Sequence, residues 1–116
     1  MIKKASQREK GKRLEREVAD LLTGLTGVSF RRTPSSGAYF TMRGDVMKIG
    51  QEVSSMDTFI IECKNTKRLV IPEWIKQVKG EMIDSNKKRF ILVFNIRGEK
   101  YFMTNESGFC FLLKKS

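Results

Sequence analysis

Histidine is absent from this chain of 116 residues, and its absence removes several kinds of chemistry. Without imidazole there is no histidine general base, no Ser-His or Cys-His nucleophile pair, and no imidazole ligand for a metal ion. The two cysteines, Cys63 and Cys110, lack CxxC spacing, so we expect reduced thiols and no zinc site. Any catalysis by this chain is therefore expected to use carboxylates, lysine and a metal ion.

Long apolar segments are also missing. No apolar run approaches the roughly 20 residues that a membrane-spanning helix needs, and no signal-peptide core follows the start at residues 1–4. The glycine-rich patterns of nucleotide-binding loops do not occur either, so no nucleotide cofactor is expected. These absences predict a cytoplasmic protein that does not contact a membrane.

Positive charge is what the chain has in excess. It contains 23 Lys and Arg against 13 Asp and Glu, which gives a net charge of +10. Such a charge on one small domain favours a polyanionic partner, and nucleic acid is the expected one. A basic surface that serves only solubility would have the same composition, so charge alone does not decide. The length predicts a single domain over residues 1–116, with a basic arm at residues 1–9.

Two amphipathic helices are predicted from apolar residues at helical spacing. The first is expected to end at Gly24 or Gly27, and its apolar stripe is Leu14, Val18, Leu21, Leu22 and Leu25. The second is expected to begin at Pro72, and its stripe is Ile71, Ile75, Val78 and Met82. Trp74 on this helix is interpreted as a core residue or a dimer contact.

Strands are predicted at residues 28–32, 45–49, 58–64, 89–94 and 100–104, with loops at 33–38 and 51–57. The continuous apolar run at 89–94 is typical of a strand covered on both faces, so it is expected near the centre of a sheet. Residues 109–113 are a candidate last strand, and their apolar side chains would either close the core or form an interface. The order α-β-β-β-α-β-β predicts an α/β (α+β) fold with a central mixed sheet flanked by helices.

Acidic and basic residues interrupt the strand predicted at 58–64. Its two-residue period puts Ile60, Glu62 and Lys64 on one face and Cys63 on the other. With Asp45 upstream, two carboxylates and an ammonium could hold a divalent metal ion and orient a water against a phosphate. A surface ion pair on an edge strand would give the same local pattern.

The first helix carries Gly11-Lys12-Arg13-Leu14-Glu15-Arg16-Glu17. Glu15 and Glu17 flank the apolar stripe on opposite sides, so periodicity does not say which of them reaches the strand. Together with Asp45 and Glu62-Cys63-Lys64, this segment resembles the PD-(D/E)xK nuclease superfamily. It is most similar there to archaeal-type Holliday junction resolvases and related phage endonucleases.

The resemblance covers about the first two thirds of the chain. The helix motif of those nucleases, Gly-x-x-x-Glu-Arg-Glu, assigns the catalytic glutamate to Glu15. Their strand-end arginine and Ser/Gly loop correspond to residues 31–32 and 35–37. The chain departs from the pattern at Gly44, where the superfamily name has proline, and in a long connection between Asp45 and Glu62.

The resemblance implies a restriction-endonuclease-like core and a Mg²⁺- or Mn²⁺-dependent, structure-selective DNA endonuclease, foremost a Holliday junction resolvase acting as a homodimer. It assigns catalysis to Glu15, Asp45, Glu62 and Lys64. The implied metal ligands are Asp45, Glu62, the Cys63 carbonyl oxygen and Glu15, the last directly or through water. Gln77 is a candidate to line the site, with an ordinary exposed position as the alternative. The DNA-contacting candidates are Arg16, Arg31, Arg32, Ser36, Gly37, Arg43, Lys67 and Arg68.

Two other functions fit the same residues. One is a nicking or restriction-like nuclease that acts on ordinary duplex DNA. The other is a catalytically silent DNA-binding module that keeps the fold for its basic surface.

Overall fold

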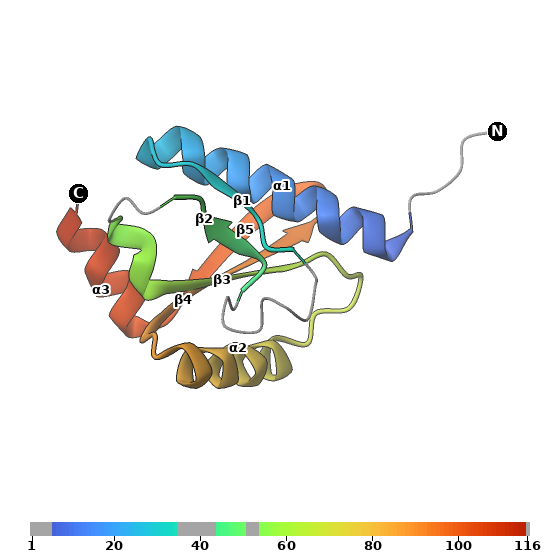
Figure 1. Ribbon diagram of the computed structural model, residues 1–116. Coiled ribbons are helices and arrows are strands. Elements are labelled where there is room, and N and C mark those ends of the chain that lie inside the picture. The colour runs from blue at the N-terminus through green and yellow to red at the C-terminus, as the bar shows by residue number, and fades with distance from the viewer. Residues whose placement is uncertain (1–5, 35–43, 51–53, 116) are drawn as a thin grey trace.

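The computed structural model describes residues 6–34, 44–50 and 54–115, and the arrangement of these residues is drawn in Figure 1. The helices and strands follow in chain order. They are α1 (Gln7–Thr26), β1 (Phe30–Arg32), β2 (Val46–Lys48), the 3₁₀ helix η2 (Ser55–Thr58), β3 (Phe59–Lys64), α2 (Ile71–Ser85), β4 (Arg89–Ile96), β5 (Glu99–Thr104) and α3 (Glu106–Lys115).

The main sheet has three strands in the order β3-β4-β5. Strand β4 pairs in parallel with β3 and antiparallel with β5, so the sheet is mixed and β4 is its central strand, as its apolar sequence predicts. The predicted α/β (α+β) class is confirmed. Strands β1 and β2 instead form a separate antiparallel pair, so the predicted single sheet is divided into two parts.

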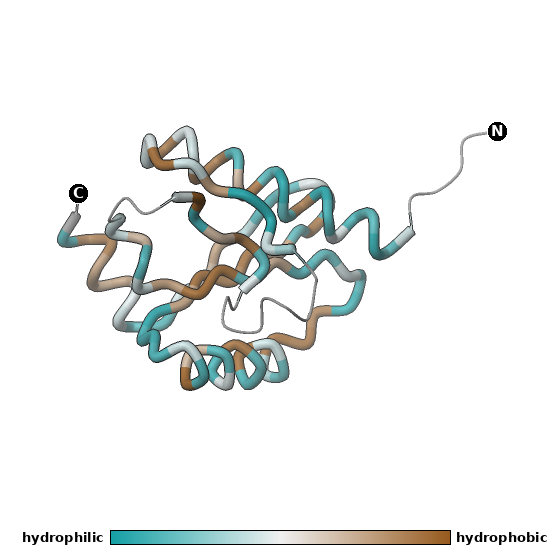
Figure 2. The backbone as a smooth tube through the Cα atoms, in the orientation of Figure 1, coloured by the Kyte–Doolittle hydropathy of each residue, from teal (hydrophilic) through white to brown (hydrophobic). Residues whose placement is uncertain are grey.

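The two faces of the main sheet are covered by different layers. Helix α2 lies on one face, and α1 with the β1-β2 pair lies on the other (Figure 1). Because side chains alternate along β3, this strand contributes to both cores. Phe59, Ile61 and Cys63 pack on the α1 side, whereas Ile60 packs with Trp74 on the α2 side. Figure 2 shows apolar colouring along β3 and β4, the strands whose residues belong to both cores.

Helix α1 begins and ends with local caps. The Ser6 hydroxyl accepts a hydrogen bond from the Glu9 N–H (3.1 Å), and Gly27 ends the helix with φ 75°. Gly27 is therefore the C-cap, and Gly24 lies within the helix. The predicted basic arm at residues 1–9 is too long, because Gln7 is already helical; residues 1–5 lie outside the described part.

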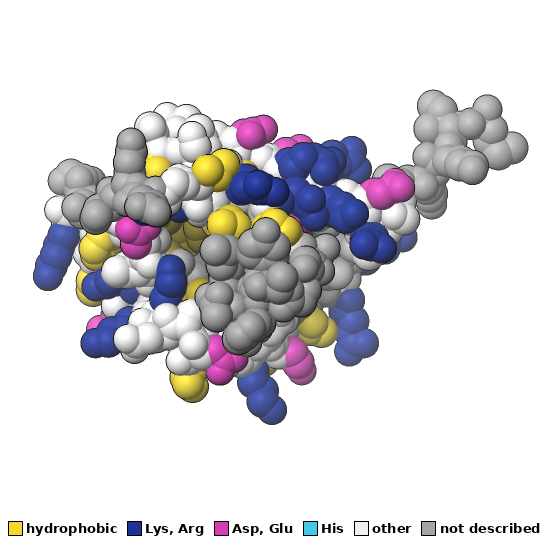
Figure 3. Space-filling view, viewed as in Figure 1, with side chains coloured by type: hydrophobic (Ala, Val, Ile, Leu, Met, Phe, Trp, Pro, Cys, Tyr) yellow, Lys and Arg dark blue, Asp and Glu magenta, His cyan; other side chains and the backbone are white. Residues whose placement is uncertain are grey.

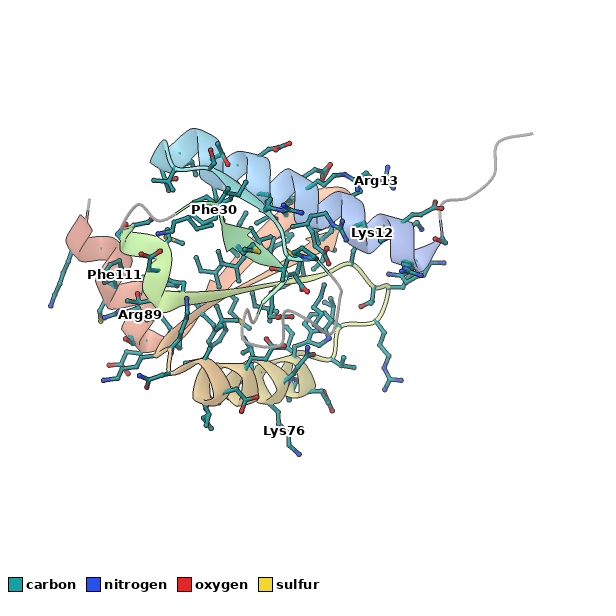
Figure 4. The ribbon with its side chains drawn as sticks, viewed as in Figure 1. Lys12, Arg13, Phe30, Lys76, Arg89 and Phe111 are labelled. Carbon is teal, nitrogen blue, oxygen red and sulfur yellow. The ribbon has the colours of Figure 1, made fainter. Side chains whose placement is uncertain are left out.

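Residues 109–113 belong to helix α3, so the candidate strand there is wrong. The side chain of Asn105 accepts the Gly108 N–H (3.0 Å), and its carbonyl accepts the Phe109 N–H (2.9 Å), which starts a helical turn. Phe111 packs edge-on against Phe59, with ring centroids 5.6 Å apart. The Arg89 guanidinium lies 4.4 Å from the centroid of the same Phe111 ring (Figure 4).

The loop predicted at 51–57 is in part the 3₁₀ helix η2, which is capped by Ser54; residues 51–53 lie outside the described part. The loop predicted at 33–38 is described only at Thr33 and Pro34. Among the described helices, none combines the length and the apolar character needed to cross a bilayer.

Candidate active site

Glu62 is the one charged side chain among the described residues that is buried in the core, with 3% of its surface exposed. It lies on β3 between the buried residues Ile61 and Cys63, and it shares the α2 face of the strand with Ile60 and Lys64. The predicted alternation along β3 is therefore confirmed. A solvated ion pair on an edge strand would leave Glu62 exposed, so its burial argues for a special role of this carboxylate.

Asp45 is attached to the free edge of β3 by two hydrogen bonds. Its backbone N–H donates to the Ile61 carbonyl (2.7 Å), and its Oδ2 accepts the Cys63 N–H (2.8 Å). The N–H and C=O of a strand residue point to the same edge, so the carbonyl of Cys63 also faces Asp45. The Cys63 side chain points instead into the core beside α1.

Gly44 allows this close approach. It has φ 93°, and a Cβ atom there would lie 2.9 Å from the Ile61 carbonyl oxygen. The departure from proline in the superfamily motif thus has a steric explanation in this chain.

The carboxyl groups of Asp45 and Glu62 are hydrogen-bonded to each other, which requires a proton between them. Burial, a hydrogen bond to Glu81 and the charge of Asp45 raise the pKa of Glu62 to about 11. Burial also raises the pKa of Asp45, although the Cys63 N–H opposes this shift. Two acidic groups placed against each other in this way form a site where a cation would offset their repulsion.

Glu81 on α2 joins this group, and the sequence analysis missed it. It lies beside Glu62, whose pKa it raises, and its Oε2 atom is buried and has no hydrogen-bond partner among the described residues. Its Oε1 accepts a weak hydrogen bond from Gln77 Nε2 (3.4 Å). Gln77 and Glu81 are four residues apart on one helix, so the spacing could have indicated Glu81 once Gln77 was a candidate.

Lys64 donates a hydrogen bond to the Oε1 atom of Gln77 (2.7 Å). Gln77 is exposed, and this hydrogen bond places it next to a predicted catalytic residue, so its lining of the site stays a prediction. Trp74, one turn earlier on α2, is buried and packs against Phe94, so it is a core residue.

Glu15, rather than Glu17, faces this site. Its Oε1 accepts a hydrogen bond from Arg32 Nε (2.9 Å), and burial followed by the charge of Asp45 raises its pKa. Glu17 lies on the other flank of α1, where it pairs with Lys100 (3.1 Å). Four acidic side chains from four segments thus converge at β3, namely Glu15, Asp45, Glu62 and Glu81.

The predicted DNA-contacting residues differ in how exposed their side chains are to solvent. Arg32 is partly buried against Glu15, whereas the side chains of Arg16, Arg31, Lys67 and Arg68 are exposed. Ser36, Gly37 and Arg43 lie outside the described residues. Figure 3 shows Lys and Arg side chains gathered over the N-terminal half of α1.

The acidic side chains suit a hard divalent cation by their chemistry, because such ions take oxygen ligands. In the side-chain arrangement of the described residues, no three Asp, Glu, Cys or His groups are placed to hold a metal ion together. Asp45 and Glu62, with the Cys63 carbonyl beside them, are the oxygen donors that do lie together. The unpartnered Oε2 of Glu81 is a further buried acceptor in this group. The oxygen donors of these residues therefore suit, by their chemistry, the divalent metal ion that the resemblance implies, although the described side chains are not gathered around one point.

Comparison with known proteins identifies the family of this chain. A model of the family described as "Phage putative PDDEXK endonuclease" matches residues 6–115. Searches of the curated proteins and of the solved structures gave no significant match. Because the family match extends over almost the whole chain, the chain belongs to this family of phage PDDEXK endonucleases.

Proposed function

We propose that this chain is a metal-dependent endonuclease that hydrolyses phosphodiester bonds in branched DNA, foremost a resolvase of four-way junctions. Membership of the endonuclease family supports the nuclease activity and a DNA substrate. The observation that carries the metal dependence is the pairing of the buried Glu62 with the half-buried Asp45, which is fixed to β3 beside Lys64. A purely structural salt bridge would not bury two acids against each other.

In this proposal Asp45, Glu62 and the Cys63 carbonyl hold Mg²⁺ or Mn²⁺, and Glu15 contributes through water. When bound, the ion supplies Lewis acidity toward the scissile phosphate and toward an attacking water. Lys64, held by Gln77, presents an ammonium that orients the water and offsets negative charge in the transition state. Arg32 holds the Glu15 carboxylate in position.

We also propose that the chain works as a homodimer, because a symmetric junction offers two equivalent strands to two sites. An apolar groove of about 500 Å³ between α1, β5 and α3 supports this proposal. The described residues of its lining include no charged side chain, and they include the exposed side chains Leu21, Leu25, Phe102 and Leu112. On a chain of net charge +10, an uncharged face is where two copies meet with least repulsion.

The test of the substrate is a panel of labelled four-way junction, flap and linear duplex, incubated with Mg²⁺ or with EDTA. We expect symmetric cleavage of the junction, little cleavage of the linear duplex, and no cleavage in EDTA. Asp45→Asn is expected to lose cleavage and keep junction binding. Equal cutting of linear duplex would instead support the nicking or restriction-like alternative, and absence of metal-dependent cutting would support the silent DNA-binding module.

The homodimer is tested by sedimentation equilibrium of the wild type and of Phe102→Asp. We expect a dimer for the wild type and a monomer for the variant, because the new charge would be buried without a partner. Lys76→Asp on α2 is the control, since Lys76 points away from the molecule (Figure 4) and lies outside the groove. A wild-type monomer at micromolar concentration, alone and with junction DNA, would refute the dimer.

A further inference from the structure

A second basic surface lies on the flank of α1 opposite to Glu15. It is a groove of about 770 Å³ between the N-terminal half of α1, the segment that follows β3, and the turn from β4 to β5. Five cationic residues from these three segments line it: Lys10, Arg13, Lys67, Arg97 and Lys100. We name this set of residues the basic groove. Only Lys67 is among the DNA-contacting residues that the sequence predicts.

The charge of the basic groove is largely uncompensated. Among the described residues, Glu17 is the only acidic one in its lining, and it pairs with Lys100 at 3.1 Å. The other four cations have no acidic partner within the described part of the chain. Several like charges around one concave surface repel each other, so the groove favours a polyanion that neutralises them together.

The lining also offers groups that suit the other parts of a nucleotide. Oδ1 of Asn95 is buried and has no hydrogen-bond partner among the described residues, so an acceptor is available for an N–H or O–H donor. Leu69 is 43% exposed at the groove, and the half-buried Ile96 adds apolar surface for sugars or bases. Asn65 connects two sides of the groove: its Nδ2 donates a hydrogen bond to the Lys10 carbonyl (3.1 Å), which links the segment after β3 to α1.

The basic groove begins where the candidate active site ends. Asn65, Thr66 and Lys67 line it and follow Lys64 directly in the chain. Consecutive residues are only about 3.8 Å apart, so a nucleic-acid strand that passes Lys64 meets the groove next. The strand would then cross from one flank of α1 to the other.

We propose that the basic groove binds the phosphodiester backbone of the nucleic-acid strand that leaves the cleavage site. Arg13, Lys67 and Arg97 contact its phosphates, and Asn95 accepts a hydrogen bond from a base or sugar. This inference rests on the proposed nuclease function, since the strand is the substrate of that reaction. The groove sets how far beyond the cut the substrate must extend.

The experiment measures binding without cleavage, so that it does not depend on the reaction. In the Asp45→Asn background with EDTA, the triple variant Arg13→Gln, Lys67→Gln, Arg97→Asn is titrated with a labelled 20-nucleotide single strand at several salt concentrations. Asparagine is chosen at position 97 because Arg97 has φ 52°, which asparagine tolerates. The matched control removes three exposed cations elsewhere, with Lys76→Gln, Lys79→Gln and Lys114→Gln.

We expect the groove variant to bind roughly tenfold or more weakly at moderate salt, with a slope of log K against log salt reduced by about 2. The control variant should keep the wild-type slope. Equal losses in both variants, or an unchanged slope in the groove variant, would overturn the proposal. So would displacement of the strand by inorganic pyrophosphate at equal phosphate concentration, because a compact anion would then be the ligand. If the groove variant shows this change of slope but the wild-type protein cuts no DNA, the proposed role of the basic groove stands and the proposed nuclease function is refuted.

Discussion

Oδ2 of Asp45 accepts the backbone N–H of Cys63 across 2.8 Å, so this carboxylate is fixed to the backbone of the strand that carries Glu62. The backbone N–H of Asp45 makes a second bond to that strand, at the Ile61 carbonyl (2.7 Å). The separation of the two acids is thus determined by main-chain contacts. Small changes in the backbone next to Asp45 should therefore alter the site more than changes in distant side chains.

Gly44→Ala should reduce cleavage strongly. The new Cβ would lie 2.9 Å from the Ile61 carbonyl oxygen at a residue with φ 93°, so Asp45 must move away from β3. We expect a loss of stability of about 1–3 kcal/mol and a fall in kcat, measured by denaturant unfolding and by single-turnover cleavage. Gly50→Ala is the control, because Gly50 has φ 86° but nothing within 4 Å of a Cβ. Equal effects on kcat at both glycines would contradict the steric explanation.

Glu62→Gln should stabilise the metal-free protein at neutral pH while abolishing cleavage. Glutamine removes a buried acid but keeps its size and its hydrogen bonding. We expect a gain of about 1–3 kcal/mol in the free energy of unfolding, measured by urea denaturation in EDTA. A loss of stability would show that the ionised carboxylate is structurally required.

The raised pKa of Glu62 predicts how the stability of the metal-free protein depends on pH. The folded state holds the proton of Glu62 more tightly than the unfolded state, whose carboxyl titrates near 4.5. Its contribution to stability is therefore complete below pH 4.5 and declines as the pH rises toward 11. In urea titrations of the metal-free protein, Glu62→Gln should flatten this decline, and Glu9→Gln on the exposed first turn of α1 should leave it unchanged.

Glu81→Gln should weaken metal binding and cleavage together. Glu81 lies beside Glu62 and brings a further buried oxygen to the group. We expect roughly a 10- to 100-fold loss in Mn²⁺ affinity by calorimetry, as for other residues that orient metal ligands. Glu73→Gln, at an exposed position in the first turn of α2, should bind Mn²⁺ like the wild type. Unchanged Mn²⁺ affinity in Glu81→Gln would exclude Glu81 from the site.

Arg32→Ala should move the acid limb of the cleavage pH profile to higher pH. The hydrogen bond and charge of Arg32 lower the pKa of Glu15 against burial, so their removal lets that pKa rise further. Glu15 would then ionise only at higher pH. Arg31→Ala is the control, because it removes the neighbouring exposed arginine. It should leave the acid limb of the pH profile at its wild-type position, even if DNA binding weakens in both variants.

Much of this site follows from short-range patterns in the sequence. The two-residue period of β3 determines which face carries Glu62 and Lys64, and the central position of β4 follows from its apolar run. The sequence did not decide between Glu15 and Glu17, because both flank the apolar stripe of α1. Only their partners, Arg32 and Lys100, distinguish them in the structure. Both partners lie outside α1, Arg32 on β1 and Lys100 on β5, so the spacing within the helix does not reveal them.

The remaining differences arise from contacts that the sequence does not display. Strands β1 and β2 pair only with each other, because the contact with β3 is made by Asp45 rather than by a strand ladder. At residues 109–113 the cap formed by Asn105 outweighs the strand propensity of the aromatic residues. Glu81 was missed because its burial depends on how α2 packs on β3.

Because β3 contributes to two cores, the candidate site is complete only when the layers on both faces of the sheet have packed. Glu62, Lys64, Gln77 and Glu81 belong to the sheet and the α2 layer, whereas Asp45 and Glu15 arrive with the α1 layer. A chain in which only one layer has docked would hold half of the acidic groups. Hydrolytic competence would thus arise only when both halves have come together, which would keep incompletely folded copies from cutting DNA.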